Sequence, residues 1–267
     1  MIAGVWTRRL KRSVLGMAER FGYDIERHED LSPPYRLVKR IQLGGDGLRD
    51  AATILGRPLQ RVIDVGAHVG QTAVRIADAN PLAVIYCFEP DPRSYAELAR
   101  TARGSDRVHP INAAVGDHDG EATLFVNRFS QTNSLLKAAE GAERFLVDPG
   151  QMMLEGHTRV PLLTLDRFCA ERAVDGIDLL KIDTQGYELR VLDGARELMA
   201  RRQVPLLYLE VSFVPYYEGQ PLFPEVYTYL YERGYRLVWL YESGFRTHFY
   251  SVGANALFVH EAAGEKP

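Results

Sequence analysis

The sequence has few cysteines, no long apolar run and little net charge, and each shortage excludes a class of protein. Its two cysteines, Cys87 and Cys169, are too few for a disulfide framework or a cysteine-rich metal cluster. Both stand in apolar contexts, so we expect buried thiols in a reducing, cytoplasmic compartment. No apolar run reaches the roughly 18 residues of a membrane-spanning helix. The first residues, MIAGVWTRRLKRSVLG, lack the sustained apolar core of a secretory signal.

The remaining composition suits one large globular domain with a short appendage. The chain has 267 residues, 46% of them hydrophobic, and its net charge of −3 gives no reason to expect a nucleic-acid partner. Residues 1–58 are expected to form an N-terminal helical extension, with an amphipathic helix over about the first 30 residues and a second helix at Leu48–Leu55. Residues 59–262 are expected to form the main domain and 263–267 a tail.

From Gln60 onwards, strand-like apolar runs alternate with helical segments. The runs are RVIDVG, QTAVRIADAN, AVIYCFEP, RSYAELARTAR and RVHPINAAVG, and their order predicts an α/β fold with a doubly wound, mostly parallel sheet. After the DHDG turn, EATLFV is interpreted as an added hairpin strand. Residues 130–160 are polar and irregular, which predicts either disorder or a loop over the active site. YRLVWLYE and NALFVHE are expected to close the sheet as an antiparallel pair.

The stretch VIDVGAHVGQ ends a predicted strand in an aspartate and a glycine-rich turn. Such a turn lets a ligand approach the backbone and the N-terminus of the next helix. His68 replaces the middle glycine of a dinucleotide-binding fingerprint, and Asp64 would repel a pyrophosphate, so a dehydrogenase is disfavoured. Asp64 suits a positively charged ligand such as a sulfonium, and Glu89 in CFEPD is placed to bind a ribose diol. The alternative is a glycine turn of another doubly wound protein.

Several stretches together resemble the FkbM family of S-adenosylmethionine-dependent methyltransferases. They are VIDVGAHVGQ, FEPDP, NAAVGDHDGEATL, TLDRF with LLKIDTQGYELRVLDGA, LEVSFVPYYEG and the terminal ALFV. The resemblance implies a seven-stranded, Rossmann-like class I methyltransferase fold and methyl transfer, usually to oxygen. Many relatives have asparagine at the position of His68. The cofactor-binding residues that we infer are Asp64, Gly66, Ala67, His68, Gly70, Glu89, Pro90, Asn112, Ala113, Ala114 and Asp183.

A sugar hydroxyl is a poor nucleophile, so a base or a metal ion is expected beside it. Asp183 and Glu210 each end a predicted strand at the carboxyl edge of the sheet, and both are predicted catalytic residues. His68 is a further candidate base, and its alternative role is to form a hydrogen bond within the loop. Asp183 has the alternative role of a helix N-cap, and Glu188 that of an acid favoured by the helix dipole. Acids that converge there would also suit a divalent cation such as Mg²⁺.

Two stretches are predicted to line the acceptor site. One contains Tyr216 and Tyr217, whose rings suit sugar stacking, and the other is Gln131–Ser134. The predicted function is O-methylation of a hydroxyl of a saccharide, glycolipid or glycosylated natural product. A non-sugar acceptor (polyketide hydroxyl or nitrogen) and a non-catalytic S-adenosylmethionine-binding module remain as alternatives. The sequence leaves open the acceptor, metal dependence, the role of residues 1–58 and the oligomeric state, a homo-oligomer included.

Overall fold

The computed structural model describes residues 23–27, 35–39, 43–241 and 250–264. The chain divides into two compact units, residues 1–45 and 46–267. In the first unit, β1 (Tyr23–Arg27) and β2 (Tyr35–Lys39) pair antiparallel. The predicted N-terminal helix is therefore wrong for Tyr23–Arg27, since YDIER follows the period of two of a strand. The rest of that helix lies outside the described residues.

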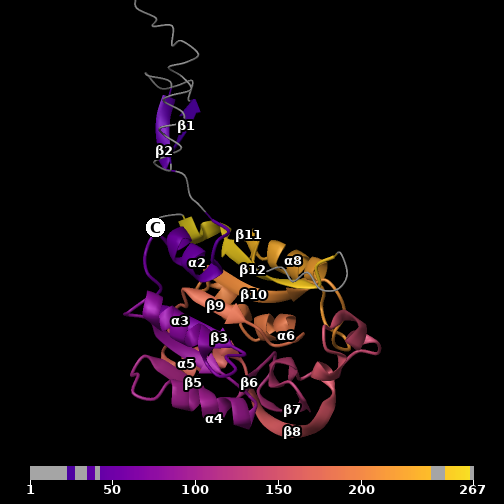
Figure 1. The fold of residues 1–267 in the computed structure, drawn as a ribbon. Coiled ribbons are helices and arrows are strands. Elements are labelled where there is room, and N and C mark those ends of the chain that lie inside the picture. Colours follow the sequence, from indigo (N-terminus) through magenta and orange to yellow (C-terminus); the bar gives the residue numbers. More distant parts are fainter. Residues whose placement is uncertain (1–22, 28–34, 40–42, 242–249, 265–267) are drawn as a thin grey trace, which may run out of the picture. The chain divides into compact units, whose positions relative to one another are not determined.

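The second unit is built on the predicted seven-stranded sheet (Figure 1). All its strands run parallel except β12, which is antiparallel to both neighbours, β10 and β11. The predicted fold class and the antiparallel closing pair are thus confirmed. The strand order is β11 (Tyr235–Tyr241), β12 (Gly253–His260), β10 (Leu206–Ser212), β9 (Leu179–Ile182), β3 (Arg61–Val65), β4 (Val84–Phe88) and β5 (Val108–Ile111).

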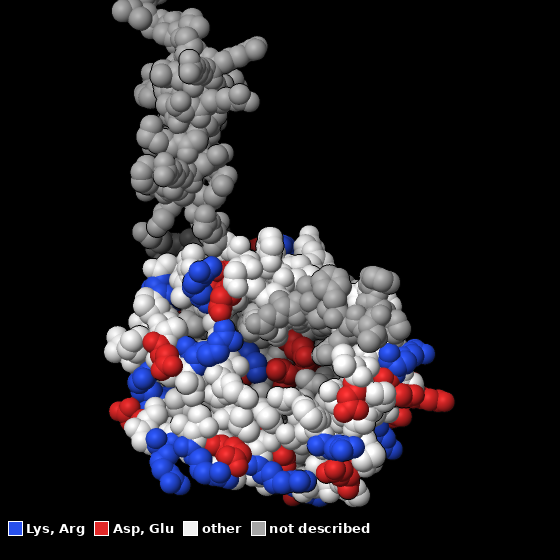
Figure 2. Space-filling view, in the orientation of Figure 1, with Lys and Arg blue, Asp and Glu red and all other residues white. Residues whose placement is uncertain are grey.

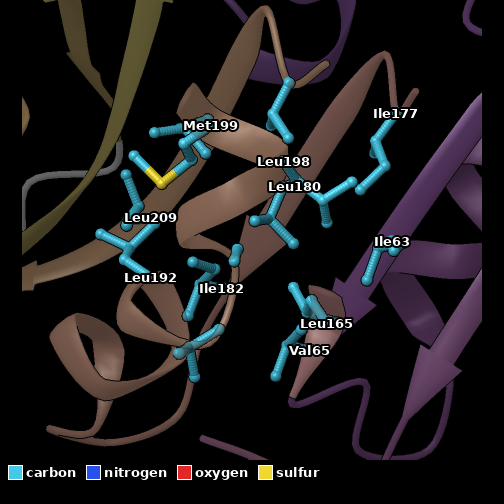
Figure 3. Packing of buried hydrophobic residues seen from close by; sticks show 14 of the residues in the cluster. Ile63, Val65, Leu165, Ile177, Leu180, Ile182, Leu192, Leu198, Met199 and Leu209 are labelled. Atoms are coloured by element: carbon cyan, nitrogen blue, oxygen red, sulfur yellow. The ribbon is translucent and has the colours of Figure 1, made fainter. Parts of the chain in front are cut away.

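Helices cover both faces of this sheet, because successive side chains of each buried strand point to opposite faces. Ile63 and Val65 pack into one apolar layer with α5 to α8, part of which Figure 3 shows. Val62 packs into the other layer with α2 to α4. Cys87 and Cys169 are free, buried thiols, as predicted. The helices are α2 (Gly47–Leu55), α3 (Gln71–Ala79), α4 (Pro92–Thr101), α5 (Leu165–Arg172), α6 (Glu188–Asp193), α7 (Arg196–Ala200) and α8 (Phe223–Tyr231).

The predicted helix at Leu48–Leu55 is confirmed as α2, which belongs to the second unit. The Asp46 side chain caps its first turn, and Gly56 ends it in the left-handed region at a φ of 67°. Leu48 and Ala51 pack into the core of the second unit. Residues 46–58 of the predicted extension are therefore part of the unit that carries the sheet.

A second, three-stranded sheet stands beside the first, in the order β6 (Ala114–Val115), β8 (Leu154–Leu163) and β7 (Gly120–Asn127). The prediction that EATLFV forms a hairpin with the strand before the DHDG turn is wrong. β7 pairs antiparallel with β8, and β8 separates it from β6. The reason is length: β6 offers two residues for pairing, whereas β8 offers ten.

Residues 128–153 join β7 to β8 and are called the β7–β8 segment below. The segment contains three 3₁₀ turns, η1 (Ser130–Thr132), η2 (Ala142–Phe145) and η3 (Pro149–Met152). Backbone hydrogen bonds from Ala139 to Tyr216 and from Glu218 to Lys137 tie it to the chain after β10. For residues 130–153, the structure therefore supports the second of the two predicted alternatives, disorder and a loop over the site. For residues 154–160 both alternatives are wrong, because these residues belong to β8 and pair with β7. In the described part of the chain, no helix is both long and apolar enough to cross a membrane.

Candidate active site

A cavity of about 530 Å³ opens at the carboxyl ends of β3, β4, β9 and β10. This is the edge at which open α/β sheets bind ligands, and the volume falls in the usual range for small-molecule sites. Acidic side chains lie in a hollow on this face of the molecule (Figure 2). The cavity walls come from the turn after β3, the end of β4, the β7–β8 segment and the residues that follow β9 and β10.

The glycine-rich turn after β3 forms one wall through its backbone. Gly66 has a φ of 76°, and a Cβ there would collide with the carbonyl oxygen of Asp183. His68 also lies in the left-handed region, at a φ of 49°, a conformation that histidine and asparagine tolerate better than most residues. Gly66, Ala67 and His68 line the cavity. Gly70 does not, because it faces Leu98 below the turn and opens α3.

Glu89, directly after β4, is a buried carboxylate that lines the cavity. Its oxygens accept hydrogen bonds from the backbone N–H groups of His68 at 2.8 Å and Asp91 at 2.9 Å. Burial raises the pKa of Glu89 to about 7, although those N–H groups act in the opposite direction. A ribose diol would supply two further donors to these oxygens, so the geometry fits the predicted role.

Asn112 supports this wall from behind. Its side-chain nitrogen donates to the carbonyl oxygens of Glu89 at 2.8 Å and Pro90 at 3.2 Å. Asn112 is not among the residues that line the cavity, whereas Pro90, Ala113 and Ala114 are. The structure thus gives Asn112 a supporting position and leaves the flat alanine surface for the ligand.

The prediction that Asp64 binds a positively charged ligand is wrong. Its carboxylate is fully buried, does not line the cavity and lies 3.0 Å from Nζ of Lys181. Burial raises the pKa of Asp64, and Lys181 acts against that rise. The positive charge beside Asp64 is therefore the chain's own ammonium. The two residues meet because β3 and β9 are neighbours in which Asp64 stands opposite Lys181.

Lys181 is a site residue that sequence reasoning missed. Its buried ammonium donates to the carbonyl oxygen of Gly66 at 3.1 Å and lies 3.5 Å from Oδ2 of Asp183. Burial alone would lower the pKa of Lys181, but Asp64 and Asp183 together raise it. The only available signal was a charge inside the apolar strand IDLLKID. Lys181 connects the turn after β3 to the acids at the floor of the cavity.

Asp183 and Glu210, predicted from separate strand ends, come together on the cavity floor and share a hydrogen bond. Burial alone would raise the pKa of Asp183, but Lys181 and the bond from Glu210 hold it below its ordinary value. Burial and the charge of Asp183 raise the pKa of Glu210 well above its ordinary value. Of the two acids, Glu210 therefore holds a proton more strongly, and Asp183 is the one that ionises more readily.

Gln185 joins this acid pair to the opposite wall and was also missed. Its Nε2 donates to Oδ1 of Asp183 at 3.0 Å and to Oε2 of Glu210 at 2.5 Å. Its Oε1 accepts from the hydroxyl of Tyr217 at 3.1 Å, and that hydroxyl also donates to the carbonyl of Thr132 at 2.9 Å. The backbone of Gln185 lies in the left-handed region, at a φ of 54°. The sequence signal that could have identified Gln185 was its place in LLKIDTQGYE, within a stretch that carries the family resemblance.

Both predicted acceptor walls line this same cavity. Gln131, Thr132, Asn133 and Ser134 do so from the β7–β8 segment, and Tyr216 and Tyr217 do so after β10. The hydroxyl of Ser134 donates to the backbone carbonyl of Gln185 at 2.7 Å.

The other candidate acids and bases have different surroundings. Glu188 is buried away from the cavity, where one oxygen accepts from the N–H groups of Thr184 and Gly186, both at 3.1 Å. It therefore closes the loop after β9. His68 lines the cavity with Nε2 2.9 Å from the Ser130 hydroxyl, and burial lowers its pKa, so the ring is neutral at pH 7.

No group of three or more His, Cys, Asp or Glu side chains suited to a metal ion occurs in the described ranges.

Comparison with known proteins places the chain in a family. The family profile described as "Methyltransferase FkbM domain" matches residues 64–237. The chain belongs to the FkbM methyltransferase family. It is accordingly an S-adenosylmethionine-dependent methyltransferase, and its seven-stranded, mostly parallel α/β fold is the class I fold of such enzymes.

Individual relatives are distant. The 2-O-methyltransferase NoeI of Sinorhizobium fredii is 27% identical over 175 residues, which cover 64% of this chain and 71% of NoeI. The 31-O-demethyl-FK506 methyltransferase FkbM of Streptomyces tacrolimicus is 29% identical over 161 residues, 53% of this chain and 61% of that protein. A crystal structure of methyltransferase FkbM from Methylobacillus flagellatus is 14% identical with a TM-score of 0.48. That match covers 76% of this chain and 44% of the solved chain.

The residues of the cavity fit the cofactor that the family implies. Glu89 presents a carboxylate for a ribose diol, and Ala113 and Ala114 leave room for a flat ring. Ionised Asp183 supplies negative charge beside the turn that would hold a sulfonium. When bound, S-adenosylmethionine supplies a methyl group activated by that sulfonium, and the protein supplies position and electrostatic field.

Proposed function

We propose that this chain transfers a methyl group to a hydroxyl oxygen of a sugar, with Asp183 as the general base. The observation that carries the proposal is the position of Asp183 on the cavity floor, where Nε2 of Gln185 donates to it at 3.0 Å and Nζ of Lys181 lies 3.5 Å away. These neighbours hold the pKa of Asp183 below its ordinary value, so it is the ionised acid of the pair. A base must be ionised before it can accept a proton, and a neutral partner that donates to it fixes its direction. The names of both relatives also denote transfer at oxygen positions.

The proposed step is an in-line displacement. The acceptor oxygen forms a bond to the methyl carbon as the carbon–sulfur bond breaks, and the hydroxyl proton passes to Asp183. The electron pair of the broken bond stays on sulfur, so the sulfonium becomes a neutral thioether. Gln185 and Lys181 hold Asp183 in place, which favours an aligned approach of the two reacting atoms.

A sugar acceptor is supported by the polar character of the cavity floor and walls. The amides of Gln131 and Asn133 line the cavity, Nδ2 of Asn133 is buried without a hydrogen-bond partner, and the ring of Tyr216 offers a stacking face. A polyketide hydroxyl or a nitrogen acceptor is the competing proposal within the same fold. His68 stays a second candidate base, because its neutral ring lines the cavity.

The proposed step requires no metal ion, since Asp183 accepts the proton directly. The Lys181 ammonium, 3.5 Å from Asp183, also competes with any cation for that carboxylate. The predicted assistance by Mg²⁺ stays a prediction, which EDTA tests. We also propose a reducing, cytoplasmic location, supported by the two free, buried thiols.

The first experiment is calorimetric titration of the full-length protein with S-adenosylmethionine and S-adenosylhomocysteine, with EDTA or with Mg²⁺. We expect micromolar binding of both that does not depend on the metal. Methyl transfer is then measured on a panel of saccharides, glycolipids and amines, and mass spectrometry and NMR locate the new methyl group. Methylation of nitrogen alone would overturn the proposal. Binding without turnover on any acceptor would favour the non-catalytic module.

A further inference from the structure

Ser212 is a residue of the cavity wall that the proposed step leaves unused. It is the last residue of β10, lines the cavity and is 8% exposed. Residues two apart along a strand point to the same face, so Ser212 stands on the face of β10 that carries Glu210. Its neighbour in the β10–β12 pairing is Gly253, which adds no side chain there. The Ser212 hydroxyl therefore lies beside the acid pair, on a wall that a bound acceptor must pass.

Gln220 fixes the direction of the hydrogen bond that Ser212 makes within the protein. The Oε1 atom of Gln220 accepts from the backbone N–H groups of Tyr216 at 2.8 Å and Tyr217 at 3.2 Å. Its Nε2 atom is then the one that faces Ser212, and it donates to Oγ at 2.8 Å. A hydroxyl has one hydrogen of its own to donate, besides the lone pairs with which it accepts. Among the described residues, no hydrogen bond uses the hydrogen of Ser212.

Other hydroxyls of the cavity wall are already used by the protein. Those of Thr132 and Ser134 donate to backbone carbonyls at 2.8 Å and 2.7 Å, and that of Thr184 donates to a carboxylate at 3.1 Å. These bonds hold the β7–β8 segment and the loop after β9 in place. Ser212 differs from them because its hydrogen is available to a bound molecule.

Asn133 presents a second donor of this kind. Its Oδ1 atom accepts from the backbone N–H of Asn127 at 2.8 Å, which fixes the amide, and its buried Nδ2 atom has no hydrogen-bond partner. Asn133 also lines the cavity. A buried donor without an acceptor is unfavourable, and a ligand that brings an acceptor removes that cost. The cavity thus offers two donors, Ser212 and Asn133, to oxygen lone pairs of a bound molecule.

The place of Ser212 on its strand indicates which oxygen it reaches. Glu210 and Ser212 are two residues apart in an extended strand, which separates their Cα atoms by about 6.6 Å. Asp183, the proposed base, shares a hydrogen bond with Glu210. This spacing suits two different oxygen atoms of one sugar ring, one at Asp183 and the other at Ser212.

We infer that Ser212 selects the acceptor: its hydroxyl donates to the oxygen of a second hydroxyl group, in the same sugar ring as the hydroxyl that reacts at Asp183. This inference rests on the proposed function and deepens it, because the acceptor must then carry two hydroxyl groups at a set spacing. A simple alcohol or amine brings no second oxygen and would leave Ser212 without an acceptor. Asn133 favours the same kind of molecule, since it too is a donor.

The test measures what each hydroxyl of the acceptor contributes with and without Ser212. The full-length protein is assayed for methyl transfer to the methyl glycosides of D-glucose, D-galactose, D-mannose, D-xylose, L-fucose and L-rhamnose. The glycoside with the highest kcat/KM is then compared with analogues that each lack one of the hydroxyls that are not methylated. With the unaltered protein, one analogue should lose about tenfold in kcat/KM, because one hydrogen bond is absent. With Ser212→Ala, that analogue should react as well as its parent glycoside.

Two controls accompany the variant. Ser212→Ala should bind S-adenosylhomocysteine as the unaltered protein does, which shows that it folds. Ser251→Ala removes a hydroxyl that donates to the carbonyl of Gly253 at 3.1 Å and does not line the cavity, and it should keep the pattern of the unaltered protein. Equal losses for every analogue in the unaltered protein and in Ser212→Ala would overturn the inference. The same loss of pattern in Ser251→Ala would overturn it too.

A comparison on the unaltered protein keeps the inference testable where Ser212→Ala does not fold. Fluorine in place of a hydroxyl accepts a hydrogen bond weakly and cannot donate one. Calorimetry on the protein loaded with S-adenosylhomocysteine should therefore give a higher affinity for the deoxyfluoro analogue than for the deoxy analogue at the affected position. Equal affinities would mean that the protein accepts from that hydroxyl, and would overturn the inference.

The outcomes separate this inference from the proposed function. If S-adenosylhomocysteine binds but none of the six glycosides is methylated, the sugar acceptor of the proposed function is overturned, and this inference with it. If a glycoside is methylated and its analogues lose equally in the unaltered protein and in Ser212→Ala, this inference alone fails.

Discussion

The two halves of the cavity are built in different ways. One half, formed by the turn after β3 and the end of β4, is proposed to hold the cofactor and is called the cofactor half. It uses a short piece of chain, in which the Glu89 carboxylate accepts from the N–H of His68, 21 residues earlier. The other, formed by the β7–β8 segment and the residues after β9 and β10, is proposed to hold the acceptor and is called the acceptor half. It uses distant pieces, since Ser134 bonds to Gln185 across 51 residues and Tyr217 bonds to Thr132 across 85. A local site made largely of backbone groups depends on few side chains. A site made of distant side chains depends on every element that brings them together.

The largest effect is expected in the acceptor half. Asp183→Asn should lower kcat by about 10²–10⁴ and leave the affinity for S-adenosylhomocysteine nearly unchanged, because it removes the base and keeps the shape of the site. Glu210→Gln is the matched control, since the amide can donate to Asp183 as the protonated acid does, and it should cost less than about tenfold. Steady-state kinetics and calorimetry measure both. Equal losses in the two variants would contradict the assignment of Asp183, and not Glu210, as the base.

Among these variants, those that break the ion pair between Asp64 and Lys181, below both halves of the cavity, should have the largest effect on the free energy of unfolding. Lys181→Met leaves the buried carboxylate of Asp64 without its cation, and the expected loss is about 3–5 kcal/mol in the free energy of unfolding. The double variant Asp64→Asn/Lys181→Met removes the stranded charge as well and should be more stable than the single variant. Urea denaturation of both proteins measures the difference. A double variant that is less stable than the single one would exclude this explanation.

The cofactor half should respond through Glu89. Glu89→Ala is expected to weaken S-adenosylhomocysteine binding by about tenfold to a hundredfold, because a hydrogen bond to a charged group contributes about 1.5–3 kcal/mol. With its pKa at about 7, Glu89 is partly protonated at neutral pH. A ribose diol donates to the ionised form, so affinity should rise as the pH rises through about 7. Glu89→Gln should abolish that dependence, and calorimetry across this pH range checks both statements.

The smallest of these effects should come from Gln185, which links the acid pair to the far wall. Gln185→Leu removes a donor to ionised Asp183, and loss of a hydrogen bond to the charged form raises its pKa. Activity needs that form, so the acidic limb of the kcat/KM profile should move to higher pH. Gln131→Leu, the same change elsewhere on the cavity wall, should leave the limb in place. A loss of activity without this movement would show a purely structural role for Gln185.

The cofactor half could largely be predicted from the sequence because its signals are local. A left-handed turn requires glycine or a tolerant residue, so Gly66 and His68 mark the turn directly. Glu89 follows the next strand in the chain. Asp64 shows the limit: its position at the end of β3 was predicted, but its partner depends on which strand lies beside β3.

The acceptor half followed from the sequence only in outline. Asp183 and Glu210 were predicted at the same sheet edge, since parallel strands end together. The opposite shifts of their pKa values, and the bonds of Gln185 to both, depend on β9 and β10 being neighbours. Lys181 was missed because a lysine in an apolar strand has no meaning until the opposing Asp64 is known.

Local backbone chemistry thus accounts for the fold class, the glycine turn and the acids at the strand ends, because each depends on residues that are close together in the sequence. Strand order, the pairing of β7 with β8 and the protonation of the acid pair depend on contacts between residues far apart in the chain. Those contacts place charges within a few ångströms of one another in buried surroundings, where the dielectric screening of water is lost. Burial and proximity, which lower the pKa of Asp183 and raise that of Glu210, exist only in the folded protein.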